Sequence, residues 1–133
     1  MAADPTALYK QISLENAPPI KIVRLLYEKA IQHMERLRRL DPVQQPIDFN
    51  AAIEKADAIV VELRISLDPS HAPHLTTNLE SLYLFVEDRL ALALAERSAE
   101  PIVAAIGVMR DLLEAWRSIE LGGGIDATGR TAA

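Results

Sequence analysis

Two histidines three residues apart, His71 and His74, are the clearest candidates for chemistry in this sequence. This spacing allows two imidazoles to share a metal ion on one face of a helix. Pro69 and Pro73, however, place both histidines in an expected loop, and no third histidine or well-placed acid completes a site. We therefore expect no metal centre, and we interpret the pair as loop histidines.

Other catalytic arrangements are also missing from the pattern. A di-metal centre in a helical bundle needs Glu-x-x-His pairs that project inward from two helices, whereas every residue that we place on an inward stripe is Tyr, Trp or aliphatic. The run Gly122-Gly123-Gly124 follows an expected helix rather than opening one, so it does not form a usual phosphate cradle. We interpret His33 as a partly buried structural histidine. We therefore expect neither an enzyme nor a cofactor.

Composition restricts the class of protein further. The chain has 133 residues, 14 Lys and Arg against 19 Asp and Glu, and no cysteine. The net charge of −5 argues against nucleic-acid binding, and the lack of cysteine fits a reducing cytosol. The first residues do not resemble a signal peptide, and no apolar run approaches the roughly 20 residues of a membrane helix. We expect a soluble cytoplasmic protein without membrane insertion.

Proline, glycine and apolar spacing predict four helices at about residues 18–40, 48–67, 72–96 and 98–120. Within each segment apolar residues recur every three or four positions, which forms one stripe on a helix. Short connections between helices of similar length make neighbours antiparallel. The sequence therefore predicts an all-α, antiparallel up-and-down four-helix bundle over residues 18–120. It also predicts a short N-terminal segment at 1–17 and a flexible, disordered C-terminal tail at 121–133.

These helices carry more apolar residues than a bundle core requires. At 100° per residue, Ala58, Val61 and Ile65 of the second helix point away from its core stripe. On the third helix Leu84 points nearly opposite the core, and Phe85 lies on a flank, as Leu92 does. Several outward apolar residues on two successive helices suggest a partner site. A homo-oligomer contact and ordinary packing are the alternatives.

Three groups of residues occur in a recognisable order along the chain. The first is Tyr9, Ala17-Pro18-Pro19, Leu26-Tyr27 and Ala30. The second is Ala56, Ile59, Glu62-Leu63, Ser66-Leu67-Asp68, Leu79, Leu82-Tyr83, Arg89-Leu90 and Ala93. The third is Leu112 with Ala115-Trp116. Together they resemble the flagellar secretion chaperone FliS family over roughly residues 8–119. The chain departs from the family pattern at Pro18, Lys21 and Leu94, where serine, an acidic residue and asparagine are usual.

The resemblance implies a cytosolic export chaperone. Such a protein binds the C-terminal segment of flagellin, prevents its premature polymerisation and assists its delivery to the flagellar type III export apparatus. Export-gate or flagellar assembly-factor proteins are further expected partners, and a client-free chain is expected to self-associate. The alternative is a homodimeric helical scaffold without chaperone activity.

The expected partner-binding residues combine this resemblance with the surplus apolar surface. Our hypothesis is that Val61, Ile65, Leu84 and Phe85 form groove surface, with Tyr83 beside them. The N-terminal segment supplies a lid, through Tyr9 and Ile12, that covers part of the groove when no client is bound. For Tyr9 the alternative is a packing anchor that holds the N-terminus to the bundle.

Overall fold

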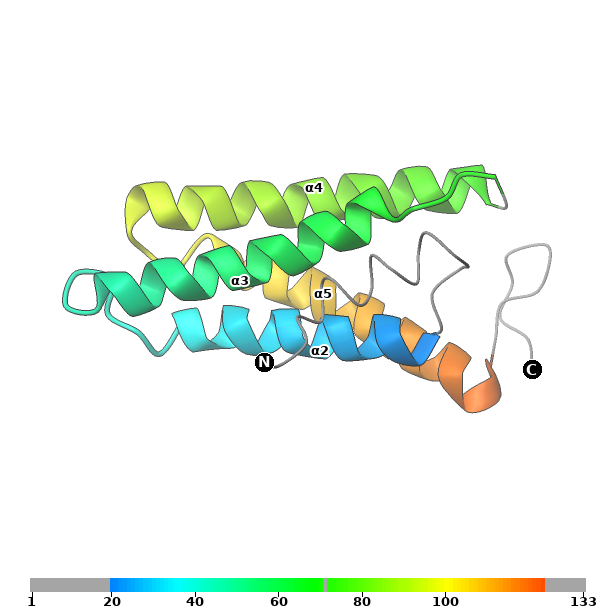
Figure 1. The fold of residues 1–133 in the computed structure, drawn as a ribbon, viewed down its shortest axis with the longest axis horizontal. Coiled ribbons are helices and arrows are strands. Elements are labelled where there is room, and N and C mark those ends of the chain that lie inside the picture. The colour runs from blue at the N-terminus through cyan, green and yellow to red at the C-terminus, as the bar shows by residue number, and fades with distance from the viewer. Residues whose placement is uncertain (1–19, 71, 124–133) are drawn as a thin grey trace, which may run out of the picture.

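The computed structural model describes residues 20–70 and 72–123, which contain helices and no strand. The helices are α2 (Ile20–Leu37), α3 (Pro46–Ile65), α4 (Pro73–Glu96) and α5 (Ile102–Ser118), and a π-helical turn, η1 (Ile119–Gly123), continues α5. Successive helices run antiparallel (Figure 1), which confirms the predicted all-α up-and-down bundle. Most of the predicted N-terminal segment and tail, at 1–19 and 124–133, lies outside the described residues.

Prolines begin two of the helices. Pro46 and Pro73 stand at the first position of α3 and α4, where the missing N–H of proline leaves no hydrogen bond unmade. Before α3 the carboxylate of Asp41 accepts hydrogen bonds from two backbone N–H groups, those of Val43 and Gln44, at 2.9 and 3.2 Å. This arrangement is typical of aspartate in turns and stabilises the connection between α2, which ends at Leu37, and α3.

The connection between α4 and α5 departs in detail from the prediction. Arg97 ends α4 in the left-handed conformation, with φ 54°, and the N–H of Ser98 donates to the Ala93 carbonyl at 3.1 Å. The Ser98 hydroxyl accepts from the Glu100 N–H at 3.1 Å, so it stabilises a turn rather than capping the helix. Helix α5 therefore begins at Ile102, four residues later than predicted.

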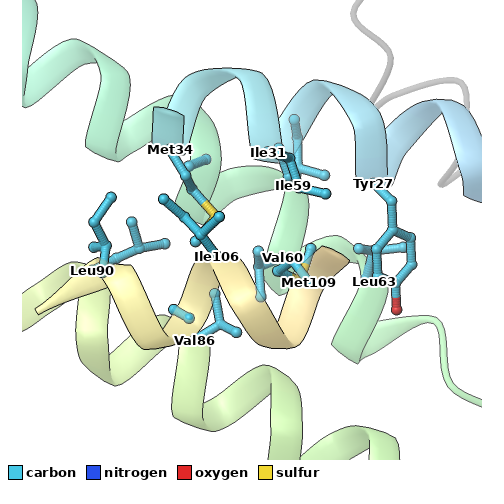
Figure 2. Packing of buried hydrophobic residues seen from close by; sticks show 14 of the residues in the cluster. Tyr27, Ile31, Met34, Ile59, Val60, Leu63, Val86, Leu90, Ile106 and Met109 are labelled. Atoms are coloured by element: carbon cyan, nitrogen blue, oxygen red, sulfur yellow. The ribbon is translucent and has the colours of Figure 1, made fainter. Parts of the chain in front are cut away.

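The four helices form a closed ring around one core. Each helix packs against its neighbours in the chain, and α5 returns to α2, whereas the diagonal pairs α2/α4 and α3/α5 are not in backbone contact. The inward stripes are aliphatic and aromatic, and no charged side chain is buried in the described part of the chain. Figure 2 shows ten of the residues that meet there: Tyr27, Ile31, Met34, Ile59, Val60, Leu63, Val86, Leu90, Ile106 and Met109.

Leu75 is an exception to the predicted stripes. It precedes the buried Leu79 by four residues, so helical spacing places it on the inward stripe, but its side chain is 46% exposed. Leu75 lies in the first turn of α4, and Figure 1 shows that this helix begins beyond the point where α3 ends. The first turn of α4 therefore has no α3 surface to pack against.

Candidate protein-binding surface

Helix α4 has the most unburied apolar surface in the bundle. It is the longest helix, with 24 residues, yet it buries only five of them. By comparison, α3 buries seven of its 20 residues and α2 seven of its 18. Among the residues of α4, five large apolar side chains are exposed: Leu75, Leu84, Phe85, Leu92 and Leu94.

An ion pair marks the flank of α4 that faces α3. The Arg64 guanidinium donates to both carboxylate oxygens of Glu87, at 2.6 and 3.1 Å. Val61 precedes Arg64 by three residues, and Leu84 precedes Glu87 by three, so each lies on the same helix face as its member of the pair. Both residues therefore lie along the seam between α3 and α4. Leu84 is 42% exposed, and Val61 is half-buried.

Ile65 follows the ion-paired arginine and extends this surface outward. It is 59% exposed, as its predicted outward direction requires. We call Val61, Ile65 and Leu84 the α3–α4 patch. Three carboxylates lie near its arginine: Glu87, Glu80 and Asp57 each raise the pKa of Arg64. Glu87 and Arg64 in turn act in opposite directions on the pKa of Asp57.

The charge around the α3–α4 patch is unbalanced. Partial burial raises the pKa of Asp57, and the neighbouring Glu87 carboxylate raises it further, against the opposing effect of Arg64. The hydrogen bond from Glu87 raises the pKa of Arg64, so this guanidinium stays charged. The carboxylates near Arg64 therefore outnumber this single cation, and the α3–α4 patch is locally acidic.

Phe85 lies on the other flank of α4. Its ring is 37% exposed, and the Arg89 guanidinium lies over it, 5.9 Å from the ring centroid. Arg89 also donates to the carbonyl of Pro101, at the start of α5, at 2.8 Å. Leu92, three residues after Arg89, is 37% exposed on the same side. We call Phe85 and Leu92 the α4–α5 patch.

Tyr83 does not belong to the exposed surface of α4, contrary to the expectation that it lies beside the groove residues. Its side chain is only 2% exposed. The hydroxyl hydrogen-bonds that of Tyr27 on α2, and the two ring centroids are 6.2 Å apart. Tyr27 in turn lies 6.2 Å from the ring of Trp116, so Tyr83 is part of an aromatic group inside the bundle.

The structure thus divides the predicted site residues into three groups. Val61 and Ile65 on α3 and Leu84 on α4 form the α3–α4 patch. Phe85 lies on the α5 flank of α4, and Tyr83 lies in the core. The predicted lid residues, Tyr9 and Ile12, lie outside the described residues. The sequence pattern did not predict the three charged residues that border the patches, Arg64, Glu87 and Arg89. The spacing of four between Phe85 and Arg89 was the only signal in the sequence that could have indicated one of them.

The described residues contain neither a metal-binding group of side chains nor a membrane-spanning helix. No group of three or more His, Asp or Glu side chains within them could hold a metal ion. Of the predicted loop histidines, His74 is exposed and His71 lies outside the described part. No helix of residues 20–70 and 72–123 combines the length and the apolar character needed to cross a membrane. The fold and these patches define a class, an all-α bundle with apolar surface suited to receive a partner polypeptide.

Comparison with known proteins identifies the family. The family model described as Flagellar protein FliS matches residues 1–122, and the chain belongs to this family. The chain is 29% identical to the flagellar secretion chaperone FliS of Campylobacter jejuni, over 84% of this chain and 87% of that protein. It is 28% identical to the Salmonella typhimurium chaperone, over 84% and 86%, and 26% identical to that of Escherichia coli, over 87% and 89%. Membership supports a chaperone role in flagellar export.

Proposed function

We propose that this protein binds the C-terminal segment of flagellin in the cytosol, prevents its premature polymerisation and assists its delivery to the flagellar type III export apparatus. Membership in a family of flagellar secretion chaperones supports this proposal. The observation that carries it is the exposure of Ile65, Leu84 and Phe85, which the monomer leaves uncovered. A client segment laid along α4 would remove these side chains from water.

The cost of ordering a disordered client sets a minimum for the apolar area that the contact must bury. A disordered segment that folds on binding loses about 2–5 kcal/mol or more of its gross interaction energy to ordering. At about 25 cal/mol per Å² of apolar area, offsetting that cost alone needs roughly 80–200 Å². An amphipathic helix in a groove can bury such an area through side chains at three- and four-residue spacing. In the α3–α4 patch, Val61 and Ile65 have this four-residue spacing on α3, and Leu84 lies on the neighbouring helix.

Calorimetric titration with the C-terminal portion of flagellin tests the proposal. The informative variant combines Ile65→Asp with Leu84→Asp, because both side chains are exposed and the fold should tolerate the change. Two lost anchors of at least 1 kcal/mol each should weaken binding by roughly thirtyfold or more. The matched control combines Val43→Asp with Ile47→Asp, which are also exposed and apolar but lie where α2 connects to α3.

The outcomes separate the site from a general effect of charge. Binding that is lost in the patch variant and kept in the control, with unchanged circular dichroism of both, supports the proposed site. Equal loss in both variants would mean that added negative charge is responsible. Unchanged affinity in the patch variant would contradict the proposed site, and absence of binding by the native protein would contradict flagellin as the client.

We further propose that the N-terminal segment acts as a lid through Tyr9 and Ile12. A lid lowers the apparent affinity by the fraction of molecules that are open, so a segment closed nine-tenths of the time weakens binding about tenfold. Deletion of residues 1–14 should then tighten flagellin binding, and the full chain with Tyr9→Ala and Ile12→Ala should show the same direction. Weaker binding after deletion would instead show that these residues contact the client or anchor the bundle. Thermal unfolding of the truncated chain distinguishes those two roles, because only an anchor contributes to stability without flagellin.

A further inference from the structure

A second surface lies between α2 and α5, away from both patches. Here the two helices border an open cavity of about 470 Å³. Two apolar side chains line its base, Ile31 and Leu113, each 6% exposed. The rim is charged, and its cations include Arg39, Arg110 and Arg117. A cavity of this size can receive one or two side chains of a partner.

The two carboxylates of the rim are already paired. Glu35 accepts from Arg110 on α5 at 3.0 Å and from Arg38 at 3.5 Å. Glu28 accepts from Arg117 on α5 at 3.2 Å, as it does from Arg24 at 3.0 Å. Partial burial alone would raise the pKa of Glu28, but the hydrogen bonds from the two arginines outweigh it and hold this pKa below its usual value. Glu28 therefore remains ionised, and both carboxylates are already bound by arginines.

Arg39 differs from the other arginines of the rim. No carboxylate within residues 20–70 and 72–123 lies within 4 Å of its guanidinium, whereas Arg110 and Arg117 each have a glutamate partner. Arg39 is exposed and borders the cavity beside Arg110. It is thus a cation that can pair with an incoming carboxylate without breaking an existing ion pair.

Charge is also unevenly divided between the two sides of the bundle. Residues 20–39 contain only two acidic residues, and their six basic residues are Lys21, Arg24, Lys29, Arg36, Arg38 and Arg39. Helices α3 and α4 together contain three basic and eight acidic residues. In a chain with a net charge of −5, α2 and the two arginines directly after it therefore form a local basic surface. Such a surface attracts acidic partners and repels basic ones.

We infer that the α2–α5 cavity is a docking site for an acidic polypeptide segment that carries an apolar anchor. The anchor side chain would contact Ile31 and Leu113, and a carboxylate of the segment would pair with Arg39. A uniformly negative partner, such as a nucleic acid or an anionic membrane, fits less well because Glu28 and Glu35 lie within the same rim. The site is distinct from the patches beside α4, since α2 lies diagonally opposite that helix (Figure 1).

Fluorescence anisotropy with a labelled synthetic peptide tests this inference on the full chain. The peptide places glutamates around one leucine at helical spacing, and two comparison peptides replace either the glutamates by glutamine or the leucine by asparagine. The acidic peptide should bind the native protein, more weakly as salt is raised, and each comparison peptide should bind at least fivefold more weakly. Arg39→Glu should weaken binding of the acidic peptide at least fivefold, whereas Arg39→Lys should retain most of the affinity for it.

A matched control and a competitor complete the experiment. Lys55→Glu changes the net charge by the same amount on α3 and should leave peptide binding unchanged. An excess of the C-terminal portion of flagellin should not displace the peptide, because the two surfaces are separate. The inference is overturned if the peptide fails to bind, if Lys55→Glu weakens it as much as Arg39→Glu, or if flagellin displaces it. It is also overturned if vesicles of phosphatidylglycerol and phosphatidylcholine bind through Arg39 where the peptide does not, or if sedimentation shows that a second copy of the chain occupies the cavity.

Discussion

The two flanks of α4 expose similar apolar side chains but are bordered by different interactions. On the α3 flank, Arg64 is held by two hydrogen bonds to the carboxylate of Glu87. On the α5 flank, Arg89 lies over the Phe85 ring and donates to a backbone carbonyl. Arg64 is therefore paired with a carboxylate, whereas Arg89 has no carboxylate partner within residues 20–70 and 72–123.

This difference gives the flanks opposite electrostatic character. Around the α3–α4 patch the carboxylates outnumber the cations, so a segment that binds there should place basic residues next to its apolar ones. The α4–α5 patch offers a cation beside its ring and does not require this. Contacts with the α3 flank should therefore weaken more steeply as salt is raised. Similar exposed area thus does not imply a similar partner sequence.

The largest predicted effect concerns Tyr83, which separates the two flanks at the centre of α4. Replacement by alanine removes a buried aromatic side chain and should lower the free energy of unfolding by about 3–5 kcal/mol. Tyr83→Phe removes only the hydroxyl that bonds Tyr27 and should cost about 0.5–1.5 kcal/mol. Urea unfolding measures both. A loss below 1 kcal/mol for the alanine variant would contradict burial of this ring.

The next prediction compares the flanks directly through two adjacent residues. Leu84→Asp and Phe85→Asp alter side chains of similar exposure, 42% and 37%, on opposite sides of α4. If the flagellin segment covers both flanks, as we propose, each variant should weaken binding by about tenfold in calorimetric titration. An effect of Leu84→Asp alone would restrict the contact to the α3 flank and remove Phe85 from the site. Circular dichroism of both variants controls for folding.

The smallest predicted effect concerns the acidity of the α3 flank. Because the pKa of Asp57 is raised in the folded protein, its ionisation costs stability as the pH rises above its ordinary value and through the folded value. Asp57→Asn should therefore stabilise the protein at pH 7, by at most about 1 kcal/mol because the site is partly solvated and screened. At pH 3 the carboxyl is protonated in both states, and the gain should vanish. Urea midpoints at the two pH values measure this, and an equal gain at both would show that charge is not the cause.

Most of the fold was predictable because local signals determine it. Prolines at the helix starts and apolar residues at three- and four-residue spacing predicted the helices and their antiparallel order. The sequence did not indicate that α5 begins at Ile102, because Ser98 resembles an N-cap but stabilises a turn instead. The glycine run was a better guide at the other end of this helix, since helical backbone continues as η1 to Gly123, within the run predicted to end it.

The candidate site was predictable only in part. The helical angle alone places Ile65 and Leu84 outside, and both are exposed. Tyr83 precedes Val86 by three residues and follows Leu79 by four, so the same rule could have placed it inside. Its partner, Tyr27, is 56 residues away in sequence, and that hydrogen bond leaves no local signal. The ion pair between Arg64 and Glu87 also depends on how α3 and α4 align, which spacing within one helix does not reveal.

The hydrogen bond between the hydroxyls of Tyr27 and Tyr83 restricts how α2 and α4 align with each other. It spans a diagonal of the ring, between two helices that are otherwise not in backbone contact. Aliphatic contacts tolerate small sliding of one helix past another, because they have no preferred direction. A directional bond in such an interior favours one axial alignment of α2 and α4 over its close competitors. This one buried hydrogen bond would then fix where the outer face of α4 lies along the axis of the bundle.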